Sequence, residues 1–177
     1  VKLIEGNRFT LGEPNGEKTD RVTVLAQAMI GAGFKVPVSA DIRSELWVKL
    51  WGNLCFNPIS ALTHATLEQI ALHPLSHSLA SQMMQEAQAV GEKTGAQFKI
   101  SIEKRIAGAQ AVGAHKTSML QDIEQGKALE LDAILGGVIE LGRVVGIPTP
   151  TLENVYSLTR LLEQSVLQSQ HGLKLNT

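Results

Sequence analysis

The sequence predicts a mainly α-helical protein with a short β-containing segment at its start. Two observations support this prediction. From residue 41 onward, every stretch with regular hydrophobic spacing repeats at three to four residues, which is the period of a helix. Before residue 41 the chain combines short apolar alternation with Gly, Asn and Pro, which are residues typical of turns.

The first 12 residues predict a β-hairpin. Val1–Ile4 is mostly apolar, Glu5-Gly6-Asn7 has turn chemistry, and Arg8–Leu11 alternates polar and apolar side chains. A loop rich in Gly and Pro follows at residues 12–18. The chain therefore opens with two short strands and a turn.

A first helix and an extended piece complete the opening segment. Asp20 is expected to cap a helix that ends near Gly31 and Gly33. The sequence Val36-Pro37-Val38 predicts a short extended stretch. No repeat and no low-complexity tract interrupts this order.

The remainder predicts only helices, each with recognisable ends. A proline suits the first turn of a helix and a glycine suits the residue after its end. Pro74 and Gly95 bracket one helix in this way, and Pro58 is expected to interrupt and kink the longest one just after Asn57. The predicted helices span about 41–63, 67–71, 74–93, 101–112, 118–126, 128–145 and 150–169.

Composition and charge exclude several classes of function. The chain has 177 residues, of which 44% are hydrophobic and 19% charged, as in ordinary globular proteins. Lys and Arg number 16 against 17 Asp and Glu, and no basic patch predicts nucleic-acid binding. No apolar run reaches the roughly 20 residues of a membrane helix. The single cysteine, Cys55, cannot form an internal disulfide, so a cytoplasmic protein is expected.

The 41–63 helix carries the strongest chemical signal. Residues four apart share a helical face, and here three such rows are apolar or nearly so. The fourth row consists of Glu45, Lys49, Asn53 and Asn57. This helix is therefore expected to be largely buried, with one narrow polar row.

Two interpretations of this polar row remain open. It is either a solvated face, with Glu45 and Lys49 as a surface ion pair, or the wall of a cleft for a small polar anion. Asn is a poor helix former, and Gly52 weakens the helix by about 1 kcal/mol relative to Ala. These costs favour the cleft, in which a lysine can bind a carboxylate or donate a proton to a carbonyl oxygen.

Three ordered blocks of the sequence form a recognisable set. The first runs from Glu45 through Lys49 and Asn53 to Asn57-Pro58-Ile59-Ser60-Ala61-Leu62-Thr63. The second is His115–Ile123 with Gly126, Lys127, Glu130 and Asp132, and the third is Gly146-Ile147-Pro148-Thr149-Pro150. Together these blocks resemble the ketopantoate reductase family, and the likeness covers nearly the whole chain. It implies a helical carboxyl-terminal domain of the 6-phosphogluconate-dehydrogenase-like type over residues 41–177, preceded over 1–40 by the tail of an NADP-binding Rossmann domain.

The resemblance also implies an activity and a set of site residues. Members of the family reduce ketopantoate to pantoate with NADPH, on the route to pantothenate and coenzyme A. Lys49 corresponds to the general acid and Asn53, Asn57 and Ser118 to substrate-binding residues. Glu130 corresponds to a carboxylate near the nicotinamide. No metal is implied.

Alternatives stay open for two of these residues. Ser118 stands three residues before Gln121, so its hydroxyl could instead cap a helix in a capping box. Glu130 is expected on the apolar face of the 128–145 helix, which favours a cleft, although a structural pair with a basic residue would also place it there.

Leu67 departs from the family pattern, since some members carry a substrate-binding asparagine there. A related 2-oxo acid is therefore an alternative substrate, which would make the protein another 2-hydroxy-acid or imine dehydrogenase. A helical interaction module without catalysis is the alternative outside enzymes. The apolar rows of several helices are compatible with a homodimer.

Other motifs in the chain are weak. Gly31-Ala32-Gly33 lacks the third glycine of a dinucleotide fingerprint and ends a helix instead of opening one. His73 and His77 stand four apart, but no third metal ligand accompanies them.

The chain starts at Val1, inside a predicted strand, as a domain taken from a longer protein would. With most of the Rossmann domain missing, it is expected to bind NADPH poorly and to be inactive alone.

Overall fold

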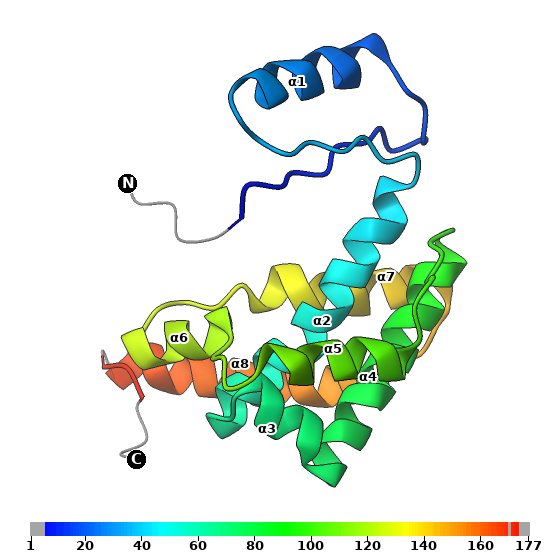
Figure 1. Cartoon of the computed structure of the whole chain (residues 1–177). Coiled ribbons are helices and arrows are strands. Elements are labelled where there is room, and N and C mark those ends of the chain that lie inside the picture. The colour runs from blue at the N-terminus through cyan, green and yellow to red at the C-terminus, as the bar shows by residue number, and fades with distance from the viewer. Residues whose placement is uncertain (1–5, 170, 174–177) are drawn as a thin grey trace. The chain divides into compact units, whose positions relative to one another are not determined.

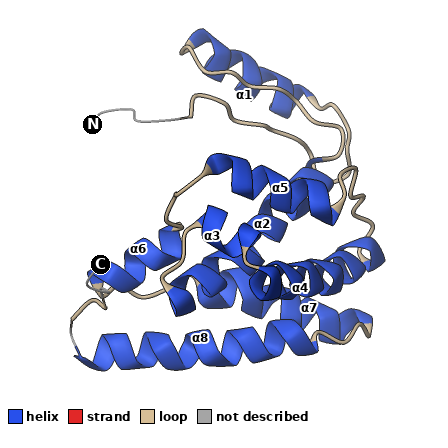
Figure 2. Ribbon diagram, turned by 60° about the horizontal axis from the view of Figure 1, so that its bottom comes forward, coloured by secondary structure: helices blue, strands red, loops and turns tan. Residues whose placement is uncertain are grey.

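The computed structural model describes residues 6–169 and 171–173. Its contacts divide the chain into two compact units, Val1–Trp47 and Val48–Thr177. Within the described residues the secondary structure is helical apart from two isolated β-bridges, which confirms the mainly α prediction (Figures 1 and 2).

In the first unit, two extended segments run parallel to each other. The amide of Phe9 donates to the Lys35 carbonyl at 2.8 Å and the amide of Leu11 donates to the Pro37 carbonyl at 3.0 Å. A parallel pair needs a crossover between its strands, and the helix α1 (Asp20–Gly31) supplies it (Figure 1). The expected hairpin arm Val1–Ile4 lies outside the described residues, and residues 8–11 pair with 35–38.

The cap of α1 differs from the prediction by one residue. Thr19 is the cap, since its hydroxyl accepts a hydrogen bond from the amide of Val22 at 3.3 Å, and Asp20 is the first helical residue. Thr19 also donates at 2.5 Å to the buried carboxylate of Glu13. Hydrogen bonds from Arg21 and then Thr19 lower the pKa of Glu13. The start of α1 is thus fixed to the loop before it.

The other helices match the predicted order closely. Helix α2 runs without a break through Pro58, so the expected interruption there is wrong. The helix α6 ends at Gln125 and is capped by Gly126, whose left-handed backbone (φ +69°) suits glycine. The bounds are α2 (Ile42–Thr63), α3 (Leu67–Leu72), α4 (Pro74–Lys93), α5 (Ile102–Val112), α6 (Ser118–Gln125), α7 (Gly137–Val145) and α8 (Pro150–Ser169).

The core of the second unit forms around the later half of α2 and around α4. The indole of Trp51 donates to the Met84 carbonyl at 2.6 Å and packs on Phe98 with ring centroids 4.6 Å apart. Helix α4 contacts α3, α5, α7 and α8, so it is central to this unit (Figure 2). The large side chains buried there are Trp51, Leu54, Phe56, Ile59, Ile70, Met83, Met84, Ile106, Leu120, Ile123, Leu131 and Leu135.

The helix expected over 128–145 is shorter and less regular than predicted. It starts at Leu131, and Asp132–Gly136 forms a π-helical turn, η1, that leads into α7. Glu130 lies before this helix and is exposed, so it is not part of an apolar helical face. The prediction assumed a regular helix from residue 128, whereas the helix begins at Leu131 and opens with a π turn, which holds one more residue than an α turn.

Candidate functional site

Two residues of the polar row of α2, Asn53 and Asn57, border a pocket within the second unit. The pocket has a volume of about 320 Å³ and is lined by residues from α2, α3, α5 and α6 together with the segment before α6. Asn53 and Asn57 line it one turn apart, and Asn57 retains only 7% of its surface exposed. The lining residues are Gly52, Asn53, Phe56, Asn57, Leu67, Arg105, Ala109, Val112, His115, Thr117 and Ser118.

The start of α6 contributes Ser118 to this pocket. The helix cap is Thr117, whose hydroxyl accepts a hydrogen bond from the amide of Leu120 at 3.2 Å. Ser118 is the first helical residue, so the alternative in which its hydroxyl caps the helix is wrong. The hydroxyl of Ser118 is exposed and makes no hydrogen bond with another described residue.

The pocket gathers polar groups that lack partners within the described chain. The side-chain amides of Asn53 and Asn57 have no hydrogen bond to other described residues, as is the case for Ser118. Polar side chains that converge on a pocket and leave their hydrogen-bonding groups free are arranged to meet a ligand. Sequence reasoning named these three residues, and the structure brings them together.

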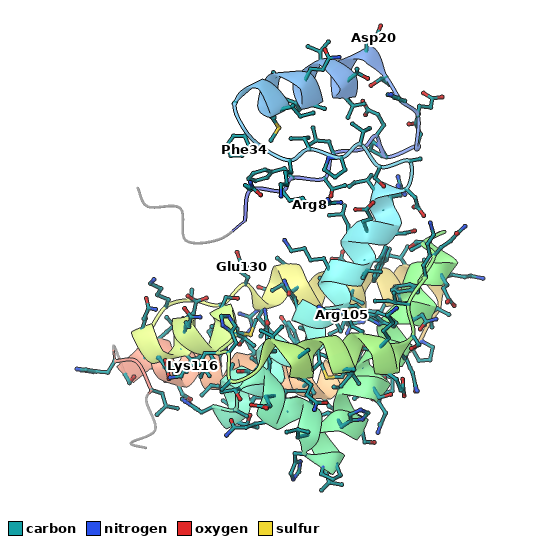
Figure 3. All side chains as sticks on the ribbon, in the orientation of Figure 1. Arg8, Asp20, Phe34, Arg105, Lys116 and Glu130 are labelled. Atoms are coloured by element: carbon teal, nitrogen blue, oxygen red, sulfur yellow. The ribbon has the colours of Figure 1, made fainter. Side chains whose placement is uncertain are left out.

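Lys49 and Glu130 do not line the pocket. Lys49 lies on α2 one turn before Asn53 and its side chain is exposed. Glu130 lies between α6 and η1 (Figure 3), where its carbonyl accepts a hydrogen bond from the amide of Ile134 at 3.0 Å. The amide of the adjacent Leu129 donates to the buried carboxylate of Glu163 at 2.7 Å. The backbone beside Glu130 is therefore held to α8.

Sequence reasoning missed the two ionisable residues of the pocket. Arg105 reaches the pocket from α5, and Figure 3 shows it beside α2. His115 lies in the segment before α6, where its carbonyl accepts a hydrogen bond from the amide of Leu67 at 3.0 Å. Arg105 had a signal in the sequence, because Gly52 leaves space for a neighbouring side chain on α2, but nothing in the sequence says which side chain fills it.

The remaining candidate residues have structural roles. Cys55 is fully buried, and burial raises the pKa of its thiol to about 12, so it remains protonated near neutrality. His73 caps α4 through its ring nitrogen Nδ1, which accepts a hydrogen bond from the amide of Ser76 at 3.3 Å.

In the part of the chain that the structure describes, no group of three or more His, Cys, Asp and Glu side chains is placed to hold a metal. No described helix has both the length and the apolar character needed to cross a membrane.

Comparison with known proteins identifies relatives of this arrangement. Residues 41–163 match the family model described as ketopantoate reductase PanE/ApbA C terminal. The 2-dehydropantoate 2-reductase of Mesorhizobium japonicum is 56% identical over 162 residues, which cover 92% of this chain and 50% of that protein. The chain thus spans about half the length of the curated relatives it matches.

Solved structures have the same fold. The 2-dehydropantoate 2-reductase of Methylococcus capsulatus matches with a TM-score of 0.79 and 33% identity, over 90% of this chain and 55% of that one. A D-mandelate dehydrogenase, solved with NADH and anilino(oxo)acetate, shares the fold at a TM-score of 0.83 and 21% identity, over 94% of this chain and 70% of that one. The family match covers more than half of the residues and includes the pocket. The chain therefore belongs to the ketopantoate reductase family, and residues 41–163 match the model of the carboxyl-terminal part of that family.

Proposed function

We propose that this chain is the substrate-binding and catalytic part of an NADPH-dependent 2-dehydropantoate 2-reductase, which reduces ketopantoate to pantoate. The observation that carries the proposal is the convergence of Asn53, Asn57 and Ser118, all without internal partners, on one pocket. The identity of 56% to the enzyme of Mesorhizobium japonicum supports the choice of substrate.

Lys49 is the proposed general acid. Reduction of a ketone builds negative charge on its oxygen, and a positioned ammonium group stabilises that charge and transfers a proton to it. Lys49 lies one helical turn from Asn53 and is exposed, so it can approach a molecule held by the amides. The amides and the Ser118 hydroxyl would fix the orientation of the substrate.

A nicotinamide cofactor would supply the hydride, and most of its binding site would lie on a Rossmann domain to which residues 1–40 belong. The described residues do not themselves form a dinucleotide cradle: Gly31 and Gly33 lie at the end of α1 and do not join a strand to a helix. Glu130 is the proposed residue of this chain on the nicotinamide side, because it is exposed and its backbone is held through Leu129.

A related 2-oxo acid is the second candidate substrate. Leu67 lines the pocket and presents an apolar side chain there. An apolar wall cannot hydrogen-bond the hydroxyl group of ketopantoate, so this residue favours an acid without that hydroxyl. The two candidates share the ketone, the carboxylate and the proposed chemistry.

A chimera tests the proposal. This chain would replace the matching half of the Mesorhizobium japonicum enzyme, and NADPH oxidation would be followed with ketopantoate and with trimethylpyruvate, which lacks only the hydroxyl. We expect turnover by the chimera with a clear preference for ketopantoate, and no turnover by the 177-residue chain alone. The intact Mesorhizobium enzyme is the control.

Each other outcome has a definite meaning. Equal kcat/KM for the two acids would mean that the substrate is a broader class of 2-oxo acids and not ketopantoate specifically. A correctly folded chimera without activity toward either acid would overturn the reductase proposal. Ordinary rates from the chain alone would refute the need for a Rossmann domain.

A further inference from the structure

The pocket contains a cation without a counterion. Arg105 extends from α5 into the lining, and its guanidinium makes no hydrogen bond or ion pair with any other described residue. Its Nε atom is buried and lacks a hydrogen-bond partner. A buried N–H donor left unpaired is costly, so this arrangement favours a ligand that accepts hydrogen bonds from the guanidinium.

Gly52 creates the space that Arg105 occupies. A Cβ atom built on Gly52 would lie 1.9 Å from one terminal nitrogen of Arg105 and 2.7 Å from its Cζ. Any other residue at position 52 would therefore push the guanidinium away from α2. Glycine in a helix interior costs about 1 kcal/mol relative to alanine, so the chain gives up helix stability at the point where it makes room for the cation.

The rest of the lining suits a small anion. No Asp or Glu lines the pocket. The first turn of α6 borders it through Thr117 and Ser118, and the start of a helix carries partial positive charge from amides without helical partners. A guanidinium binds a carboxylate through two parallel hydrogen bonds, whereas a helix start and a serine hydroxyl add single donors. The pocket thus combines a guanidinium, which can make two parallel hydrogen bonds to a carboxylate, with weaker single donors around it.

We propose that Arg105 binds the carboxylate of the 2-oxo acid and so determines the charge of the substrate that the pocket accepts. This inference rests on the proposed function, since it assigns the acid group of the same substrate. Asn53, Asn57 and Lys49 then remain available for the ketone and the distal part of the molecule. Gly52 has a positioning role, because it keeps the guanidinium against α2.

Binding to the full 177-residue chain tests the assignment. The probes are ketopantoate and ketopantoyl lactone, a neutral ring form of the same molecule, titrated by NMR chemical-shift perturbation. We expect Arg105→Gln to weaken binding of the acid roughly 10- to 100-fold, as for the loss of a charge-assisted hydrogen bond, and to leave binding of the lactone unchanged. Arg105→Lys should bind the acid more tightly than Arg105→Gln but less tightly than the unmodified chain. Lysine keeps the positive charge but cannot make two parallel hydrogen bonds to the carboxylate.

Two further variants separate recognition from folding. Lys104→Gln removes the same charge from an exposed neighbour on α5 and should leave acid binding unchanged. Gly52→Ala should raise the thermal stability of the helix or leave it unchanged, yet weaken acid binding as Arg105→Gln does, because its Cβ displaces the guanidinium. A purely structural role for Arg105 would instead weaken the acid and the lactone equally.

The outcomes distinguish this inference from the proposed function. If ketopantoate binds the unmodified chain and Arg105→Gln equally well, the assignment of Arg105 is overturned and the reductase proposal stands. If ketopantoate fails to bind but trimethylpyruvate binds and is lost in Arg105→Gln, the assignment stands and the choice of substrate fails. If neither acid binds the chain, the assignment is overturned.

Discussion

The carboxylate of Glu86, on α4, accepts a hydrogen bond of 2.9 Å from the amide of Thr151, at the start of α8. Its second oxygen accepts another of 3.0 Å from the amide of Leu152. A helix start has amides without helical partners, so one side chain from α4 completes the first turn of α8 and joins the two helices.

Replacement of Glu86 by alanine should therefore destabilise the second unit by about 1–2 kcal/mol, as the loss of a helix cap does. Urea unfolding followed by circular dichroism measures this change as a lower midpoint at constant slope. Gln85→Ala removes an exposed neighbour on the same helix and should shift the midpoint little. An equal shift for both variants would contradict the capping role.

Replacement of Lys49 by methionine should lower kcat of the chimera by a factor of about 100 to 10,000, the range of general acid catalysis. KM for ketopantoate should change far less, because Lys49 does not line the pocket. Lys93→Met, at the exposed end of α4, is the matched control and should retain kcat. If kcat survives Lys49→Met, another group protonates the oxygen.

His64 has an unfavourable backbone and an unfavourable side-chain environment. It follows α2 with φ +58°, in the left-handed region that favours glycine, and both of its ring nitrogens are buried without a hydrogen-bond partner. His64→Gly should therefore raise the free energy of unfolding by about 1 kcal/mol, since it removes both costs.

His64→Ala separates these two contributions. Alanine removes the imidazole but keeps the Cβ that makes a positive φ costly, so it should gain less stability than glycine. Thermal unfolding of the three proteins measures the order, which we expect to be glycine, then alanine, then histidine. A loss of stability in His64→Gly would mean that packing of the imidazole outweighs both costs.

The pairing of Asp132 with α8 should make stability depend on pH. Asp132 accepts a hydrogen bond from the Tyr156 hydroxyl at 2.6 Å and pairs with Arg160, and both interactions lower the pKa of Asp132. A carboxyl with a lowered pKa in the folded state adds stability above its unfolded pKa of about 4 and loses it as pH falls through the folded pKa.

Asp132→Asn should accordingly be less stable than the original protein at pH 7 and equal to it at the lowest pH at which both fold. Urea midpoints measured from pH 7 downward give this difference. Glu140→Gln, an exposed carboxylate near Asp132, is the control and should show no such convergence. A difference that stays constant with pH would show that the ionised form of Asp132 contributes nothing.

The polar row of α2 could be predicted from the sequence because helical spacing is regular there. The period placed Asn53 and Asn57 on one face, and the burial of Trp51 on another follows from the same count. Helix ends were also predictable, since Pro74 and Gly126 act on their own backbone. The polar row and the helix ends are both set by residues close together in the chain, so the sequence alone predicts them.

The remaining features of the fold and of the pocket depend on contacts between residues that are distant in the sequence. Arg105 stands 53 positions after Gly52, and only the packing of α5 on α2 explains why that glycine is needed. The partner of the extended residues 8–11 lies beyond α1, so a hairpin and a parallel pair could not be told apart from alternation alone. Thr117 and Ser118 are both good caps, and only the fold selects between them.

The π turn at Asp132–Gly136 has a consequence for sequence alignment. Because such a turn holds one residue more than an α turn, it is equivalent to an insertion of a single residue that the helix absorbs. Deletion of one residue there would leave an ordinary helix, but it would rotate every residue before the turn by about 100° relative to α7. Asp132 would then lose its position opposite Tyr156 and Arg160, and α8 would lose this partner.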